Sequence, residues 1–166
     1  MPSYQSNDAQ DPRSVRSIRL AQGDRDLARQ LFAAMADVFD TPAEPLSDAY
    51  IDKLLVRDDF WATAAFVGDE LVGGITAHTL PMTHGETAEL FVYDVAVCRH
   101  YQRMGVGRRL LSATRQLAAE SGIHLAFVAA ENVDTHAVDF YRAVGGTGSS
   151  VTLFTFERAG CAPTLI

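Results

Sequence analysis

A short glycine-containing turn, Gln102–Gly107, has the residue types and spacing of an anion-binding site. The turn follows the apolar run Leu90–Val97 and precedes a helical run, Val106–Ser121. The first N–H groups of a helix have no partner within the helix, and the helix dipole adds partial positive charge there. Glycines let the backbone approach a phosphate closely, and the nearby arginines add formal charge. We interpret the turn as a pyrophosphate-binding site.

The glycine spacing distinguishes this turn from two common phosphate sites. The turn lacks the third glycine of the dinucleotide-binding G-x-G-x-x-G motif and the Gly-Lys-Ser/Thr sequence of a P-loop. Glycine pairs also precede many helices that bind no ligand. The interpretation therefore depends on the elements around the turn.

Composition and charge limit the class of protein. A chain of 166 residues is long enough for one domain of about 150 residues. Hydrophobic residues make up 48% of the chain and charged residues 21%, which is typical of a globular protein. The net charge of −7 argues against nucleic-acid binding, which needs a basic face. An acidic protein suits a cationic substrate, although acidic surfaces also serve solubility.

The cysteines do not indicate a metal site, and the apolar stretches do not indicate a membrane-spanning segment. Cys98 and Cys161 are far apart and lack the spacing of metal ligands. No apolar stretch approaches the roughly 20 residues that span a membrane, and Met1–Arg13 lacks the apolar core of a signal peptide. We expect no metal, no membrane partner and a cytoplasmic location, with residues 1–13 disordered.

Hydrophobic periodicity and turn residues predict the element order β-α-α-β-β-β-α-β-α-β. A meander of strands that leads into β-α units implies a mixed α/β sheet with helices on both faces. The expected strands include Val15, Ile18 and Leu20, then Phe60–Val67, Leu71–Leu80, Ala88–Val97, His124–Ala130 and Val151–Phe156. The expected helices are Asp24–Phe39, a second helix capped by Ser47, Val106–Ser121 and Thr135–Val144.

This order, with Gln102-Arg103-x-Gly105-x-Gly107 after the fourth strand, resembles the GNAT superfamily of acetyl-CoA-dependent N-acetyltransferases. The pyrophosphate turn of that family reads [QR]-x-x-G-x-[GA]. A second shared feature is a short helix that ends in an aromatic-Tyr pair, Phe140–Tyr141, shortly before Gly145. The resemblance implies an α/β fold with a mostly antiparallel central sheet, splayed between its fourth and fifth strands. It places the acetyltransferase domain at residues 14–158, with a C-terminal tail at 159–166.

A narrower resemblance concerns the central strand. Residues Glu89–Val97 resemble that strand in the aminoglycoside 3-N-acetyltransferases of the gentamicin type, with a Tyr-Asp-aliphatic-Ala-Val core and an upstream Glu. Asp134 replaces the Asn of many GNAT members, as in that branch. The resemblance implies acetyl-CoA as donor and a cationic aminoglycoside, modified at its 3-amino group, as acceptor. Because the core also occurs in other GNAT enzymes, a polyamine, an amino acid or a protein N-terminus stays open as acceptor. A non-catalytic acyl-CoA sensor is the other alternative.

Two residues are expected to carry the chemistry of direct transfer in a ternary complex. The amine must lose a proton, and the leaving thiolate can take one up. A carboxylate in an apolar strand costs several kcal/mol unless it is paired. Asp94 is therefore expected to act as the base or to anchor an ammonium, with a structural hydrogen bond as the alternative. The resemblance makes Tyr141 the proton donor to sulfur, since a phenol with a pKa of about 10 is neutral at rest; a packed helix tyrosine is the alternative.

The remaining expected site residues divide between the two substrates. In the family a β-bulge near Val95 opens the sheet, and the pantetheine arm pairs with the exposed strand backbone. The residues expected to bind acetyl-CoA are Val95, Ala96, Val97, Gln102, Arg103, Met104, Gly105, Val106, Gly107 and Arg108. Those expected to bind the acceptor are Tyr93, Glu89, Glu131 and Asp134. Either His78 or His84 could relay protons, but we interpret both as surface histidines. Many relatives are dimers, which favours a homodimer.

Overall fold

A computed structural model describes residues 14–42 and 44–156 of the protein. The segment expected to be disordered, 1–13, and the tail 159–166, which contains Cys161, lie outside the described residues. The chain divides into two compact units, Met1–Ala129 and Ala130–Ile166. We describe each unit by itself.

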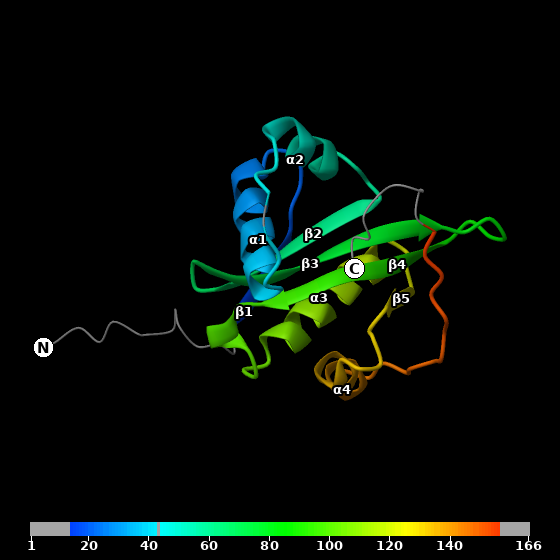
Figure 1. The fold of residues 1–166 in the computed structure, drawn as a ribbon. Helices are drawn as coiled ribbons and strands as arrows, with labels where there is room; N and C mark the ends of the chain where they lie inside the picture. The colour runs from blue at the N-terminus through cyan, green and yellow to red at the C-terminus, as the bar shows by residue number, and fades with distance from the viewer. Residues whose placement is uncertain (1–13, 43, 157–166) are drawn as a thin grey trace, which may run out of the picture. The chain divides into compact units, whose positions relative to one another are not determined.

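The first unit contains all the strands of the described residues and three of their α-helices (Figure 1). In chain order its elements are β1 (Val15–Arg19), α1 (Arg25–Val38), α2 (Asp48–Leu55), β2 (Phe60–Val67), β3 (Glu70–Pro81), β4 (Ala88–Val97), the 3-10 turn η2 (Arg99–Tyr101), α3 (Val106–Glu120) and β5 (Leu125–Val128). The strands form one sheet in the order β1-β2-β3-β4-β5. All neighbours are antiparallel except β4 and β5, which are parallel. The expectation of a mixed, mostly antiparallel sheet is therefore confirmed.

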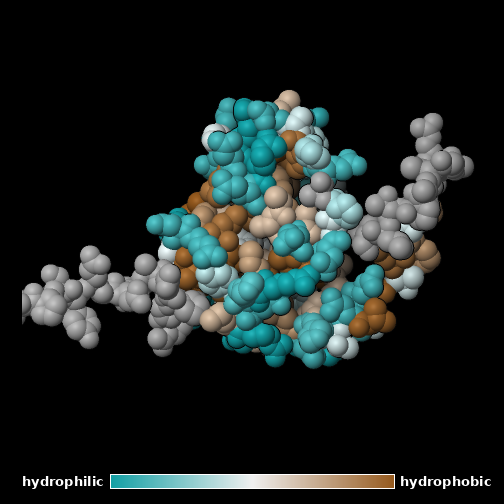
Figure 2. Space-filling model, turned by 60° about the vertical axis from the view of Figure 1, so that its left-hand side comes forward, coloured by the Kyte–Doolittle hydropathy of each residue, from teal (hydrophilic) through white to brown (hydrophobic). Residues whose placement is uncertain are grey.

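Helices cover both faces of this sheet. Figure 1 shows α1 and α2 on one face and α3 on the other. The double cover explains why all eight residues of β2 are buried, including Trp61 and Ala62, which point to opposite faces. Gly74 on β3 lets Leu31 of α1 approach the sheet closely. Figure 2 shows mainly hydrophilic residues over α1 and α2 and apolar residues at the level of the sheet below them.

Local signals at the helix ends agree with the structure. The Ser47 hydroxyl accepts a hydrogen bond from the Tyr50 N–H at 3.2 Å and caps α2, as expected. Gly105 precedes α3 with φ 82°, and Gly122 follows it with φ 79°. Both values lie in the left-handed region that favours glycine. No helix among the described residues is long and apolar enough to cross a membrane.

The second unit contains one helix, α4 (Thr135–Ala143), within its described residues 130–156. The strand expected at Val151–Phe156 is wrong, because these residues are in no strand of the described chain. Their apolar side chains are exposed, as in Val151 at 81% and Phe156 at 94%. An extended segment becomes a strand only when a neighbour pairs with its backbone. Alternating apolar residues give the tendency to form a strand but do not supply that neighbour.

Candidate functional site

The centre of the site is a β-bulge in β4. Thr76 of β3 pairs with Asp94, and the next residue, Ala77, pairs with Val92. Tyr93 is therefore the extra residue of the bulge, and two residues of β4 oppose one of β3. Pairing of β4 with β5 ends at the same point, since it covers Glu89–Val92 only. Beyond Val92, β4 has no partner among the described strands on the side away from β3, which is the expected splay.

The alternation of backbone groups shows which amides of β4 face this open edge. The Cys98 N–H donates to the Val72 carbonyl of β3 at 2.8 Å. Because backbone groups of successive strand residues point to opposite sides, those of Val95 and Val97 face away from β3. The Gln102 side-chain amide donates to the Val97 carbonyl at 2.9 Å, in agreement with this direction. Ala96 is instead paired with Gly74 of β3.

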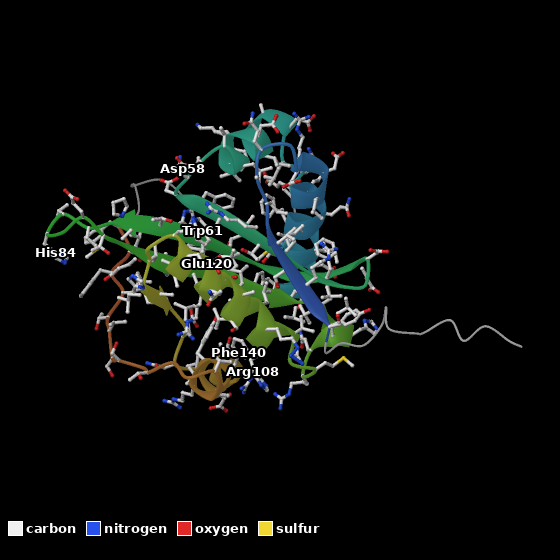
Figure 3. All side chains as sticks on the ribbon, turned by 180° about the vertical axis from the view of Figure 1, so that it is seen from behind. Asp58, Trp61, His84, Arg108, Glu120 and Phe140 are labelled. Carbon is white, nitrogen blue, oxygen red and sulfur yellow. The ribbon has the colours of Figure 1, made fainter. Side chains whose placement is uncertain are left out.

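The glycine turn lies between this edge and the start of α3. Arg103 and Gly105 both have left-handed backbone conformations, with φ of 63° and 82°. Among residues 14–42 and 44–156, no side chain caps the N-terminus of α3, and the first turn of this helix contains no acidic residue. Its first N–H groups are therefore suited to an anion. Figure 3 places Arg108 on the first turn of this helix.

Two contacts that the sequence did not indicate tether η2, which directly precedes the turn. The Tyr101 hydroxyl donates to a Glu70 carboxylate oxygen at 2.6 Å, and this bond raises the pKa of Tyr101. Arg99 donates to Asp40 at 2.8 Å. Cys98 lies between β4 and η2, and burial raises the pKa of its thiol. A thiol with a raised pKa is protonated at neutral pH, so Cys98 is a poor nucleophile.

Asp94 has a hydrogen-bond partner that the sequence did not reveal. The Thr76 hydroxyl donates to Oδ2 of Asp94 at 2.6 Å. Thr76 is 8% exposed, and Asp94 is half-buried. This charge-assisted bond offsets part of the cost of burying the carboxylate. It is a structural bond, but it uses one of two oxygens, and a carboxylate has about four acceptor positions. Asp94 therefore keeps the capacity to bind an ammonium.

Other expected residues of the first unit lie on β3, on β4 or in the hairpin between them. Tyr93 is 48% exposed, and its ring centroid is 6.0 Å from that of His78. His78 is half-buried rather than on the surface as expected, because its ring also contacts Phe60. His84 is exposed in the β3–β4 hairpin, as expected (Figure 3). Glu89 is a half-buried residue at the start of β4. Among the described residues, no group of three or more His, Cys, Asp or Glu side chains could hold a metal ion.

The other expected residues belong to the second unit. Asp134 caps α4, since its carboxylate accepts a hydrogen bond from the Ala137 N–H at 3.0 Å. Glu131 is exposed just before this cap. The rings of Phe140 and Tyr141 lie 5.1 Å apart on α4, and Tyr141 is half-buried. The expected roles of Glu131, Asp134 and Tyr141 stay predictions.

The sequence profile described as the acetyltransferase (GNAT) family matches residues 26–145, which is most of the chain. The chain belongs to the GNAT acetyltransferase family. This GNAT chain is 31% identical to an aminoglycoside acetyltransferase, meta-AAC0020, from an uncultured soil metagenomic sample, solved with trehalose. That match covers 87% of this chain and 95% of the other, with a TM-score of 0.80. The same neighbour solved with sisomicin is 30% identical over the same shares of the two chains, with a TM-score of 0.81.

Two further solved structures are similar to this GNAT chain. The aminoglycoside acetyltransferase HMB0005, from an uncultured soil metagenomic sample, is 29% identical, with a TM-score of 0.81 and coverage of 88% and 99% of the two chains. The aminoglycoside N-acetyltransferase AAC(6')-Iy in complex with CoA is 15% identical, with a TM-score of 0.70 and coverage of 87% and 95%. The last likeness concerns the fold alone. No curated protein matches the chain.

Proposed function

We propose that this GNAT protein transfers the acetyl group of acetyl-CoA to an amino group of an aminoglycoside, at the 3-amino position of its deoxystreptamine ring. The observation that carries the proposal is the position of Asp94. It lies on β4 directly beside the bulge, one residue before Val95, whose amide faces the open edge. The similarity to two aminoglycoside acetyltransferases at 29–31% identity supports the choice of acceptor.

The donor fits the turn and the strand edge. The pyrophosphate of acetyl-CoA would bind the first N–H groups of α3 and the backbone of the turn at Gly105, where no side chain of the described residues caps the helix. The amides of the pantetheine arm would pair with the backbone of Val95 and Val97, as an added strand does. The Gln102 side-chain amide donates a hydrogen bond to the Val97 carbonyl, and this bond holds the turn against the end of β4.

The reaction proceeds in one ternary complex without a covalent enzyme intermediate. The Asp94 oxygen not bonded to Thr76 takes a proton from the acceptor ammonium, or holds that ammonium while water takes the proton. The neutral amine then attacks the thioester carbon, and the carbonyl oxygen gains charge near the Val95 N–H. Collapse of the tetrahedral intermediate breaks the C–S bond and forms the amide, and the second proton of the amine nitrogen leaves through water. The resemblance to the family would make the Tyr141 phenol the proton donor to the CoA thiolate, and the proton released from the nitrogen would restore that phenol.

A substrate panel tests this proposal. Purified protein with acetyl-CoA should release free thiol with sisomicin and related aminoglycosides, and NMR of the product should show acetylation of the 3-amino group. The panel should include spermidine, free amino acids and a peptide with a free N-terminus. Faster thiol release with one of these amines than with every aminoglycoside would refute the acceptor assignment. No release above background hydrolysis with any amine would favour a non-catalytic sensor.

A further inference from the structure

Rings on four neighbouring strands lie opposite one another in the sheet. The strand register pairs Phe60 of β2 with His78 of β3, His78 with Phe91 of β4, and Phe91 with Phe127 of β5. The ring centroids of Phe60 and His78 are 5.5 Å apart, and those of Phe91 and Phe127 are stacked at 5.1 Å. Tyr93, the extra residue of the bulge, joins them at 5.7 Å from Phe91 and 6.0 Å from His78. We call these five side chains the aromatic row.

The two ends of the aromatic row differ in burial. At the β2 end, Phe60 is 8% exposed and contacts Phe32 of α1 edge to face. At the β5 end, Tyr93 is 48% exposed and Phe127 is 41% exposed. Rings packed at one end and open at the other form a rigid apolar surface, because each ring restricts the next. A contiguous exposed apolar surface marks a binding site more often than a single exposed residue does.

The exposed end of the aromatic row lies on the same face of the sheet as the Asp94 carboxylate. Thr76 and His78 are two residues apart on β3, so their side chains point to the same face. Asp94 bonds to Thr76, and Tyr93 contacts His78. A negative charge therefore lies beside a flat apolar surface. This combination matches a ligand that has an apolar ring face and a positively charged amino group.

We propose that Tyr93, Phe91 and Phe127 form the platform on which the ring of a cyclic polycationic amine packs, with one ammonium directed to Asp94. The inference rests on the proposed function, and it names the feature that selects ring amines over linear ones. The C–H face of an amino-sugar or aminocyclitol ring covers an aromatic surface without loss of rotational freedom. A linear polyamine loses that freedom on binding.

Equilibrium titration of the CoA-saturated protein tests the platform without any need for turnover. The probes are sisomicin as the ring amine and spermidine as the linear amine. Tyr93→Leu and Phe127→Leu remove a ring but keep apolar volume, and Tyr93→Phe keeps the ring without the hydroxyl. Phe39→Leu is the matched control, because Phe39 is 46% exposed at the end of α1 and outside the aromatic row.

We expect each leucine variant to weaken sisomicin binding about tenfold and to leave spermidine binding nearly unchanged. Phe39→Leu should bind sisomicin as the unchanged protein does, and Tyr93→Phe should lose less affinity than Tyr93→Leu. Equal losses for both amines, sisomicin affinities unchanged in both leucine variants, or a loss in Tyr93→Phe as large as that in Tyr93→Leu would each overturn the platform. Absence of sisomicin binding to the unchanged protein would overturn it as well. The thiol-release assay tests the proposed function separately. Ring-selective binding without acetylation would refute the proposed acetyl transfer and leave the platform in place.

Discussion

At the scale of single residues, the role of Asp94 depends on its hydrogen bond with Thr76. The 2.6 Å bond gives the carboxylate a structural partner, and it also sets which oxygen can face a substrate. Thr76 is buried, so the pair has a defined geometry rather than a mobile surface contact. We therefore expect Thr76 to act as a positioning residue for Asp94.

Replacing Thr76 with valine tests this pair, because valine has nearly the same shape but no hydroxyl. We expect Thr76→Val to lower kcat/KM for the aminoglycoside about tenfold, while the Kd of acetyl-CoA stays unchanged. Thr76→Ser restores the hydroxyl and should restore most of the activity. Full activity of the valine variant, or failure of serine to rescue it, would show that the bond serves only the fold.

The partner of Asp94 could not be predicted from the sequence. Continuing the register from the Ala77–Val92 pair would place Thr76 opposite Tyr93. The bulge shifts that register by one residue and brings Thr76 opposite Asp94 instead. A bulge has no clear sequence signature within an apolar run. The glycines of the turn can be recognised in the sequence, because a left-handed backbone conformation favours glycine.

At the scale of elements, the most predictable parts were those whose apolar runs end in turn residues. β2 and β4 have the predicted bounds, Phe60–Val67 and Ala88–Val97, because turns or polar segments flank both runs. β5 is shorter than the predicted His124–Ala130, since its pairing with β4 ends where the bulge begins. Local composition predicts where a strand occurs, but the extent of its pairing with the neighbouring strand determines its length.

The two ends of α3 offer a matched pair of glycines. Gly105 and Gly122 have φ of 82° and 79°, and a Cβ at either position meets nothing within 4 Å. Alanine at either position therefore costs about 1–2 kcal/mol of backbone strain. We expect both variants to lower Tm similarly, as measured by calorimetry.

Only Gly105→Ala should also weaken acetyl-CoA binding, by about tenfold, because Gly105 lies in the pyrophosphate turn. Isothermal titration with acetyl-CoA measures this difference. If Gly122→Ala weakened binding as much, the effect would come from α3 as a whole. If neither variant weakened binding, the turn would not be the phosphate site.

At the scale of the molecule, acid stability should depend in part on ion pairs between α1 and α2. Arg25 of α1 donates to Asp52 of α2 at 2.8 Å, and this bond holds the pKa of Asp52 below its usual value. A depressed folded-state pKa stabilises the protein above the unfolded-state value of about 4, and this contribution is lost as the pH falls through the folded-state pKa.

We expect Asp52→Asn to lower Tm at neutral pH and to lose this effect below a pH of about 4. Thermal unfolding from neutral to acidic pH measures the difference, and Asp69→Asn in the exposed β2–β3 turn is the control. A Tm difference of constant size through the acid range would show that the ion pair does not cause it.

The central claim is that Asp94 engages the acceptor amine. It is tested most directly by comparing kcat with the Kd of acetyl-CoA in Asp94→Asn, which keeps the size of the side chain and an acceptor oxygen for Thr76. Loss of the base or ammonium anchor predicts a fall in kcat of about 100-fold or more, with the acetyl-CoA Kd nearly unchanged. A variant that keeps its turnover, or that loses acetyl-CoA affinity as much as turnover, would contradict the account.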